Sequence, residues 1–307
     1  MMGVQVGLLL GLSSPVTAGK VPDPPEFSGE RSMELLVGQC ELGPRTPGSP
    51  GNRRLQEWIL DMAASSGLTA KRQCFMTDDP MGSGRIEVCN IVVSTRTGNL
   101  EGRLWLGAHF DTRPVSDLDP DPSQREKPLI GANDGASGVA VLLHLMEILG
   151  RQPPEVGVDL LFFDAEDSGH PGSPEEFCLG SRHLAETLQD FSNPLVGIKP
   201  RGLILLDMIG KEDLRVPMEG YSLRYAPAWT QGIFTRALEL GLPAFVAEPG
   251  PSIYDDHVPF LGKGIPAVDL IDFDFPQWHT TGDVPSVCSP ASLEQVGRLL
   301  VSLIYEP

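Results

Sequence analysis

Carboxylate and imidazole side chains follow four apolar runs of this sequence, at the point where each run ends. They lie in the segments LWLGAHFDT, LLFFDAED, LILLDMIG and FPQWHTTGD, and they are His109, Glu166, Asp167, Asp207 and His279. Carboxylate oxygens and imidazole nitrogens are ligands of zinc, and a catalytic zinc ion takes three protein ligands and keeps one position open. The residue types therefore predict a metal centre if the fold brings these side chains together.

A sixth candidate, Asp134, stands directly before the long apolar segment ASGVAVLLHLMEIL. As an N-cap, an aspartate would stabilise a helix by about 1 kcal/mol. Each histidine could likewise be an ordinary hydrogen-bonded side chain. These explanations are independent of one another, and together they do not explain why ligand-type residues follow four separate apolar runs. A metal site explains all of them, and we expect Asp134 to face it.

Alternating strands and helices must position these side chains. Short apolar runs predict strands near 68–76, 86–95, 103–108, 157–163, 202–206 and 266–271. Helical patterns occur at 31–41, 52–66, 136–149, 179–189, 228–241 and 290–304. The βαβ order predicts an α/β fold, with a single three-layer α/β/α domain and a mixed, mostly parallel central sheet. In such sheets the ligand crevice lies beyond the carboxyl ends of the strands, so the candidate residues should converge there.

The composition limits the classes of protein and partner. The chain has 307 residues, of which 41% are hydrophobic, so it can bury a sizeable core. Its 23 Lys and Arg residues against 41 Asp and Glu residues give a formal net charge of −18, which argues against nucleic acid or an anionic membrane as a partner. No apolar run approaches the roughly 20 residues that a membrane-spanning helix needs, so we predict no membrane span.

The N-terminal segment leaves two alternatives for location. Residues 1–18 contain an apolar stretch followed by small residues, as in a cleavable export signal, but no Lys or Arg precedes the stretch. They are therefore either a signal peptide, which would make the protein periplasmic or secreted, or a poorly structured tail of a cytoplasmic protein. Residues 19–30, rich in Pro and Gly, predict a linker to a catalytic domain over residues 31–307.

The five cysteines do not suggest a zinc ribbon, because none of them belongs to a Cys-x-x-Cys pair. An odd number of cysteines cannot all be paired within one chain. Cys74 and Cys89 fall in two neighbouring predicted strands and would form a bridge if the protein is exported. Buried free thiols are the favoured prediction for them.

Six motifs resemble, in order and spacing, the superfamily of zinc-dependent aminopeptidases and glutaminyl-peptide cyclotransferases. They are GAHFDT, GANDGASGVA, FFDAED, LLDMIG, DDHVPF and WHTTGD, and the resemblance runs from about Gly43 to the C-terminus. It implies an enzyme with the zinc aminopeptidase-like fold. A binding module that keeps this fold without catalysis is a third class of function, but every catalytic position carries a competent residue.

Two activities of the superfamily compete. The resemblance implies that an aminopeptidase would bind two zinc ions through five positions. These are His109, Asp134, Asp167, Asp207 and His279. A glutaminyl cyclase would bind one zinc ion through Asp134, Asp167 and His279, and would leave the other two in a hydrogen-bonded network. All five residue types suit both arrangements, so the ligand set does not decide between them.

Other residues resemble the cyclases, in particular the bacterial ones. Trp278 stands directly before the metal histidine, where cyclases have a Trp that packs against the substrate, and Phe275 would line the entrance. Asp255 matches the carboxylate of the cyclase DDH motif, which works together with the Asp207 position. Glu166 would be the general base and acid, taking a proton from the α-amine and returning it to the leaving ammonia.

The implied reaction converts an N-terminal glutamine of a peptide or protein to pyroglutamate with release of ammonia, on one zinc ion that acts as a Lewis acid. The alternative is hydrolysis of N-terminal residues by a two-zinc aminopeptidase. We expect a monomer. Two departures from the animal cyclases concern the pocket: His170 and Pro171 stand where those enzymes have a Trp, and Asp269 stands where they have a His.

Overall fold

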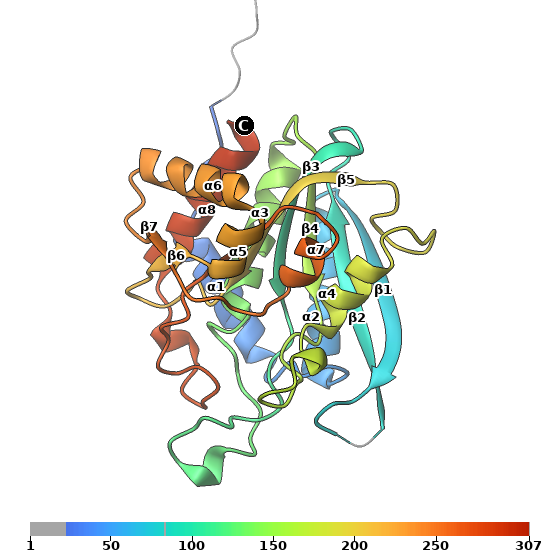
Figure 1. Cartoon of the computed structure of the whole chain (residues 1–307), viewed down its shortest axis with the longest axis vertical. Helices are drawn as coiled ribbons and strands as arrows, with labels where there is room; N and C mark the ends of the chain where they lie inside the picture. The colour runs from blue at the N-terminus through green and yellow to red at the C-terminus, as the bar shows by residue number, and fades with distance from the viewer. Residues whose placement is uncertain (1–22, 83, 307) are drawn as a thin grey trace, which may run out of the picture.

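The computed structural model describes residues 23–82 and 84–306 of the chain (Figure 1). The predicted signal or tail over residues 1–18 lies outside the described residues. Within the described part, no helix has both the length and the apolar character needed to cross a membrane.

A six-stranded sheet forms the centre of the molecule, with its strands in the order β1-β2-β4-β3-β5-β8. Their bounds are β1 Thr69–Asp78, β2 Arg85–Ser94, β3 Glu101–His109, β4 Val158–Phe163, β5 Lys199–Asp207 and β8 Ala267–Ile271. β2 pairs antiparallel with β1 and with β4, whereas β3 is parallel to β4 and β5, and β5 is parallel to β8. The sheet is mixed and mostly parallel, as predicted.

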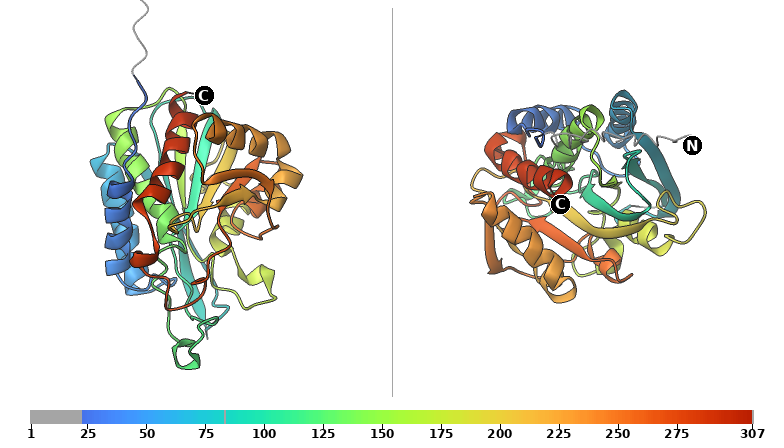
Figure 2. Two further views of the ribbon diagram at one scale, coloured as in Figure 1. Left: turned by 90° about the vertical axis from the view of Figure 1, so that its left-hand side faces the viewer. Right: turned by 90° about the horizontal axis from the view of Figure 1, so that it is seen from above.

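Helices cover both faces of this sheet and make three layers (Figure 2). Four helices pack on one face through the larger core cluster, and they are α1 (Gly29–Glu41), α2 (Pro50–Ser65), α3 (Ala136–Arg151) and α8 (Pro290–Tyr305). A second cluster covers the other face beneath α4 (Leu179–Glu186) and α7 (Val258–Leu261). The helices α5 (Gly220–Tyr225) and α6 (Pro227–Glu239) contact the edge strand β8. The predicted α/β/α fold class is confirmed.

The predicted strands and long helices are all present, with ends displaced by a few residues. The segment VDLLFF of β4 is buried at every position, which is typical of a strand between two layers of helices. Four short elements do not follow from the sequence: α5, α7, and the separate parallel pair β6 (Val216–Met218) and β7 (Phe245–Pro249). Each has between three and six residues, too few to show a periodic pattern.

The end of the predicted linker belongs to the folded structure. The Phe27 ring is buried in the larger core cluster, and the Ser28 hydroxyl accepts a hydrogen bond from the amide of Arg31. This N-cap begins helix α1 at Gly29, before the predicted start at residue 31. The cap and the buried aromatic ring explain why the helix reaches into a segment that Pro and Gly mark as a linker.

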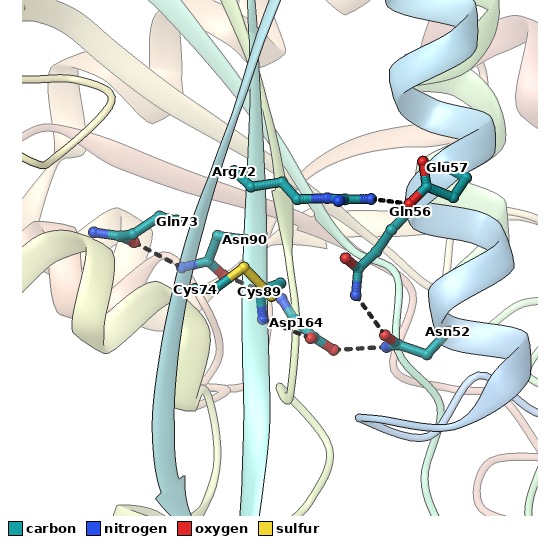
Figure 3. The surroundings of a disulfide bond; sticks show 9 residues. All are labelled: Asn52, Gln56, Glu57, Arg72, Gln73, Cys74, Cys89, Asn90 and Asp164. Carbon is teal, nitrogen blue, oxygen red and sulfur yellow. Dashed lines mark hydrogen bonds and ion pairs between the residues drawn. A yellow bond between two sulfur atoms is a disulfide. The ribbon is translucent and has the colours of Figure 1, made fainter.

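A disulfide joins Cys74 in β1 to Cys89 in β2 (Figure 3). The expectation that these two residues are free thiols is wrong. The antiparallel register sets Cys74 directly opposite Cys89, and a register cannot be read from two strand sequences alone. The other three cysteines, Cys40, Cys178 and Cys288, are free.

The disulfide-linked hairpin is tied to the end of β4. The amide of Cys89 donates to Oδ2 of Asp164 at 2.9 Å, and the Asn52 side chain donates to Oδ1 of the same carboxylate at 2.8 Å (Figure 3). Asp164 is fully buried and stands two positions before Glu166. The Asp164 side chain therefore links the hairpin and α2 to the strand end that carries Glu166.

Replacing both Cys74 and Cys89 by Ala should lower the free energy of unfolding by about 3 kcal/mol, because the disulfide closes a loop in the unfolded chain across a sequence separation of 15. Urea denaturation measures the loss. Parent and variant should become equally stable when a reductant is present, since both then lack the cross-link. A variant as stable as the oxidised parent would contradict this stabilising role.

Candidate active site

The carboxyl ends of the parallel strands meet at a cavity of about 430 Å³. The ionisable side chains that line it come from the strand ends, from the start of α3 and from the loop before α7. They are Asp134, Glu166, Asp167, Asp207, Asp255 and His279. The rest of the lining is mostly apolar and includes Phe177, Met208, Ile253, Tyr254, Ile271, Phe273 and Trp278. The fold thus brings these candidates together, although they are far apart in the sequence.

The first ligand group consists of Asp134, Asp167 and His279, all of them buried, with ligand atoms within 4.8 Å of one another. The Nε2 atom of His279 lies 3.3 Å from Oδ2 of Asp167 and 3.9 Å from Oδ2 of Asp134. The Oδ2 atom of Asp167 is buried without a hydrogen-bond donor. A buried carboxylate oxygen without a donor is costly on its own, so these three residues fit a bound cation.

The second ligand group consists of His109, Asp134 and Asp207. The Nε2 atom of His109 lies 3.1 Å from Oδ1 of Asp134 and 3.2 Å from Oδ1 of Asp207. Asp134 therefore presents Oδ1 to this group and Oδ2 to the first group. The geometry suits both sequence-based alternatives, a second ion or a hydrogen-bonded histidine beside a single ion.

The aromatic wall beside His279 contains Trp278 but not Phe275. The centroid of the Trp278 ring lies 3.9 Å from that of His279 and 4.8 Å from that of Phe273. Phe275 does not belong to the cavity lining, and its ring packs in a small apolar cluster with Met208 and Ile271. The expectation that Phe275 lines the entrance is wrong, because Phe273, two residues earlier, lies on the wall instead.

Phe177 forms the part of the cavity wall for which the sequence offers no candidate residue. His170 and Pro171, which stand where animal cyclases have a Trp, are both exposed and do not line the cavity. Phe177 lines it, with its ring centroid 5.8 Å from the guanidinium carbon of Arg113. A Cβ atom at Gly169 would lie 2.3 Å from this ring, so only glycine lets Phe177 occupy its place.

The backbone is strained where the chain delivers site residues. Ala165, Met208 and His279 have φ angles of 57°, 46° and 55°, in the left-handed region that residues other than glycine rarely adopt. This conformation costs about 1–2 kcal/mol per residue, and here it occurs directly beside Glu166 and Asp207 and at His279 itself. The surrounding contacts must outweigh that cost, which is a common property of functional sites.

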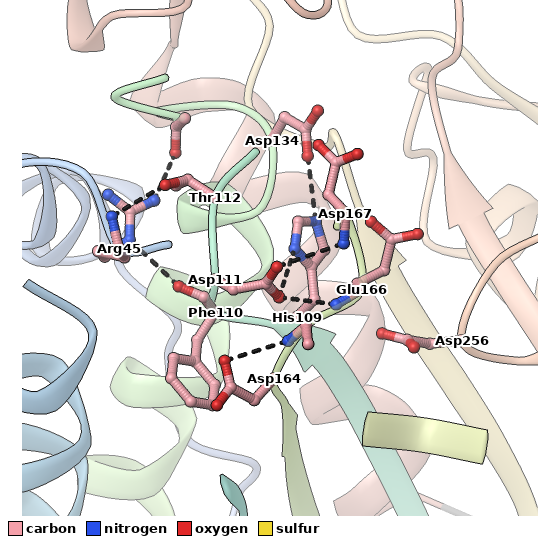
Figure 4. Close-up of polar contacts among 12 residues, drawn as sticks. Arg45, His109, Phe110, Asp111, Thr112, Asp134, Asp164, Glu166, Asp167 and Asp256 are labelled. Carbon is pink, nitrogen blue, oxygen red and sulfur yellow. Dashed lines mark hydrogen bonds and ion pairs between the residues drawn. The ribbon is translucent and has the colours of Figure 1, made fainter. Parts of the chain in front are cut away.

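Asp111 holds the turn that carries Glu166 and Asp167 (Figure 4). Its fully buried carboxylate accepts hydrogen bonds from the amide of Glu166 at 3.0 Å and from the amide of Asp167 at 3.3 Å. It also lies 3.6 Å from Nδ1 of His109. Nothing in the sequence assigns this role to Asp111, although it belongs to the same motif as His109.

Asp283 supports Asp134 in the same way. Its carboxylate accepts from the amides of Asn133 and Asp134 at 2.8 Å and 3.1 Å. Its place in the WHTTGD motif is the signal that could have found it. Asp111 and Asp283 together fix the backbone on which the ligand carboxylates stand.

Arg113 and Asp117 form a clamp across the first ligand group. One guanidinium nitrogen of Arg113 donates to Oδ1 of Asp167 at 2.9 Å, and two others donate to Asp117 at 2.8 Å each. Asp117 in turn lies 3.5 Å from Nδ1 of His279. Burial alone would raise the pKa of Asp117, but hydrogen bonds from His279 and Arg113 hold it well below its ordinary value. The clamp therefore positions two candidate ligands: Arg113 holds Asp167, and the ionised Asp117 lies beside His279.

Replacing Arg113 by Lys should lower the affinity for zinc by about 10-fold or more, because an ammonium group cannot hold Asp117 through two parallel bonds and Asp167 through a third. Competition with a zinc chelator measures the affinity. Arg53 is exposed and does not line the cavity, so Arg53→Lys is the matched control and should bind zinc like the parent. Equal affinity of Arg113→Lys and the control would show that the clamp does not orient the ligands.

Glu166 reaches the cavity but is outside both ligand groups. Burial raises its pKa well above the ordinary value, and the charges of Asp167 and Asp255 raise it further. The Cys178 thiol donates to Oε1 of Glu166 at 3.5 Å. A carboxyl group with a raised pKa beside candidate metal ligands is suited to taking up a proton and returning it.

Known proteins are similar to this chain over most of its length. The family model of peptidase family M28 matches residues 90–304. A glutaminyl-peptide cyclotransferase-like protein of Bos taurus is 26% identical over 289 residues, which cover 85% of this chain and 72% of that protein. A solved glutaminyl cyclase of Bacteroides thetaiotaomicron, bound to N-acetylhistamine, has a TM-score of 0.86 and 31% identity over 93% of this chain and 100% of that one. A solved Zn-dependent exopeptidase of Parabacteroides distasonis has a TM-score of 0.87 and 31% identity over the same shares.

Proposed function

The chain belongs to peptidase family M28, and from this premise we propose that it is a zinc-dependent glutaminyl-peptide cyclotransferase with one zinc ion. It would convert the N-terminal glutamine of a peptide or protein to pyroglutamate and release ammonia. The observation that carries the proposal is the aromatic wall of Trp278 and Phe273 directly beside His279. A glutamine that attacks its own side chain needs an apolar wall that excludes water, because water would hydrolyse the amide instead.

The first ligand group would hold the zinc ion, whose chemistry here is to polarise the γ-carbonyl oxygen of the glutamine. Glu166 takes a proton from the neutral α-amine as its nitrogen attacks the carbonyl carbon of the γ-carboxamide. Glu166 then returns this proton to the amide nitrogen, the bond from carbon to that nitrogen breaks, and ammonia leaves. One carboxyl group therefore serves as base and then as acid, and the reaction consumes no water.

Asp207 and Asp255 are proposed to hold the substrate amine. Both carboxylates line the cavity that Glu166 also lines, and neither belongs to the first ligand group. As hydrogen-bond acceptors they would orient the α-amine toward the carbonyl carbon of the side-chain amide. The charge of Asp255 also raises the pKa of Glu166, which favours proton uptake near neutral pH.

A two-zinc aminopeptidase is the second candidate, because the second ligand group is also assembled. His109 and Asp207 face the Oδ1 atom of Asp134 at a spacing that suits another ion. Glu166 would then activate a water molecule between two ions in place of an amine. The exopeptidase of P. distasonis, 31% identical to this chain, supports keeping this candidate.

Mass spectrometry of two short peptides tests the proposal. One peptide begins with Gln and the other with Leu, and each is incubated with the zinc-loaded protein. Loss of one ammonia from the Gln peptide, with the Leu peptide intact, is the expected result. Removal of the leading residue from the Leu peptide would instead establish the aminopeptidase, and the aromatic wall would then not distinguish a cyclase.

The substrates and the location are part of the proposal. Disulfides form and persist in oxidising compartments, so the bond between Cys74 and Cys89 supports the predicted periplasmic or secreted location. Peptides and proteins that begin with Gln in that compartment would be the substrates. A monomer is also proposed, and size-exclusion chromatography with light scattering tests it.

A further inference from the structure

A second cavity, of about 550 Å³, adjoins the catalytic cavity. Phe273 lines both of them. The loop before α7 also runs along both, since Ser252 lines the catalytic cavity and Pro251 lines the second one. At the end of β8, Ile271 likewise lines the catalytic cavity and Asp272 the second one. A peptide chain that leaves the catalytic cavity beside the Phe273 ring therefore reaches the second cavity.

The ammonium group of Lys211 is held in one place in the lining of this second cavity. Its Nζ atom lies 2.9 Å from Oδ2 of Asp272 and donates to the backbone carbonyl oxygen of Asp274 at 2.6 Å. Asp272 is 1% exposed and also accepts hydrogen bonds from the amides of Arg215 and Asp274, at 2.8 Å and 3.2 Å. The Lys211 side chain keeps 18% of its surface exposed, so it is anchored but not enclosed.

Lys211 retains one hydrogen-bond donor for a ligand. An ammonium group has three N–H donors. The contacts with Asp272 and Asp274 account for two of them, and residues 23–82 and 84–306 offer Nζ no further acceptor. The other cation of the lining, Arg215, is paired with Glu248 at 2.6 Å. Lys211 therefore presents an anchored, charged donor to whatever enters the second cavity.

We propose that the second cavity is a subsite for the residues that follow the N-terminal glutamine of the substrate, and that Lys211 donates a hydrogen bond to a backbone carbonyl oxygen there. The substrate class is then peptides and proteins of three or more residues, in preference to glutamine amide. Every peptide has this carbonyl group whatever its side chains, so the subsite selects for length and not for sequence. The inference rests on the proposed function, because it takes the glutamine to lie in the catalytic cavity.

Binding to the zinc-loaded Glu166→Gln protein tests the subsite, because this variant lacks the proton carrier of both candidate reactions and leaves its ligands intact. Isothermal titration calorimetry compares glutamine amide with the peptide Gln-Ala-Ala amide, whose blocked C-terminus offers Lys211 no carboxylate. Adding Lys211→Met should weaken binding of the peptide by about 10-fold, the effect of losing one hydrogen bond to a charged group. The dissociation constant of glutamine amide should stay as it is, since this ligand has no residue beyond the first.

Two more variants complete the test, each in the Glu166→Gln background. Lys263→Met is the matched control, because Lys263 is exposed and lines neither cavity, and it should leave both dissociation constants as they are. Asp213→Trp places a bulky ring in the second cavity at an exposed position of its lining, and it should weaken binding of the peptide alone. It leaves Lys211 and Asp272 intact, so it decides if Lys211→Met does not fold.

Equal weakening of both ligands by Lys211→Met would overturn the proposal, because Lys211 would then act only by holding the segment that carries Phe273. Peptide binding that neither Lys211→Met nor Asp213→Trp changes would overturn it as well. In both cases the proposed function stands, since glutamine still binds in the catalytic cavity. If neither ligand binds to the Glu166→Gln protein, the proposed function fails and the subsite fails with it.

Discussion

Replacing Glu166 by Gln should lower kcat for a peptide that begins with Gln by about 10²- to 10⁴-fold, while the zinc content stays that of the parent. Glutamine has the size of glutamate but cannot take up the proton of the α-amine. The zinc content is unaffected because Glu166 is absent from both ligand groups that contain Asp134. A coupled assay for ammonia measures kcat, and atomic absorption measures the zinc.

Glu175→Gln is the matched control for this variant. Glu175 lies in the same loop, is exposed and does not line the cavity. Its replacement makes the same chemical change and should leave kcat as it is. Activity of Glu166→Gln close to that of the control would refute Glu166 as the proton carrier under either candidate reaction.

Replacing Asp167 by Ala should remove the zinc ion of the first ligand group and reduce turnover to the level of the uncatalysed reaction. The change deletes one of the three side chains whose atoms lie within 4.8 Å of one another. It also removes the Oδ2 atom that has no hydrogen-bond donor in the structure. Two remaining ligands are fewer than any catalytic zinc site uses. Atomic absorption after dialysis measures the loss.

Two further variants distinguish the loss of a metal ligand from a general effect of the substitution. Asp167→Glu keeps a carboxylate and should recover part of the zinc, whereas Asp190→Ala, which removes an exposed aspartate, should change nothing. Thermal unfolding of each variant shows whether the fold is intact. A folded Asp167→Ala protein that holds as much zinc as Asp190→Ala would exclude Asp167 as a ligand.

The fold and the main candidate residues could be predicted because local patterns determine them. Apolar runs such as LLFF and LILL identify buried strands, and the rule that ligands bind at the carboxyl ends of parallel strands gathers Glu166, Asp167 and Asp207 at one edge. No knowledge of loop paths is needed for this step. The six motifs then order the candidate residues along the chain.

The remaining parts of the site depend on how distant segments meet, which the sequence does not show. Asp111 acts through backbone amides, and Asp117 acts through Arg113, so their positions in the sequence do not reveal these roles. The pairing of Cys74 with Cys89 depends on register. Phe273 lies on the wall and Phe275 does not. Both residues belong to an irregular loop, in which no periodic pattern predicts the side chain that faces the cavity.

The two-sided carboxylate of Asp134 makes this residue the shared member of both ligand groups. Because its Oδ1 faces His109 and its Oδ2 faces His279, the same five residues suit a centre with one ion or with two. A substitution at His109 or at His279 would disturb one group and leave the other assembled. A substitution at Asp134 would remove an oxygen atom from each group at once, so no other single ligand position controls the whole centre in this way.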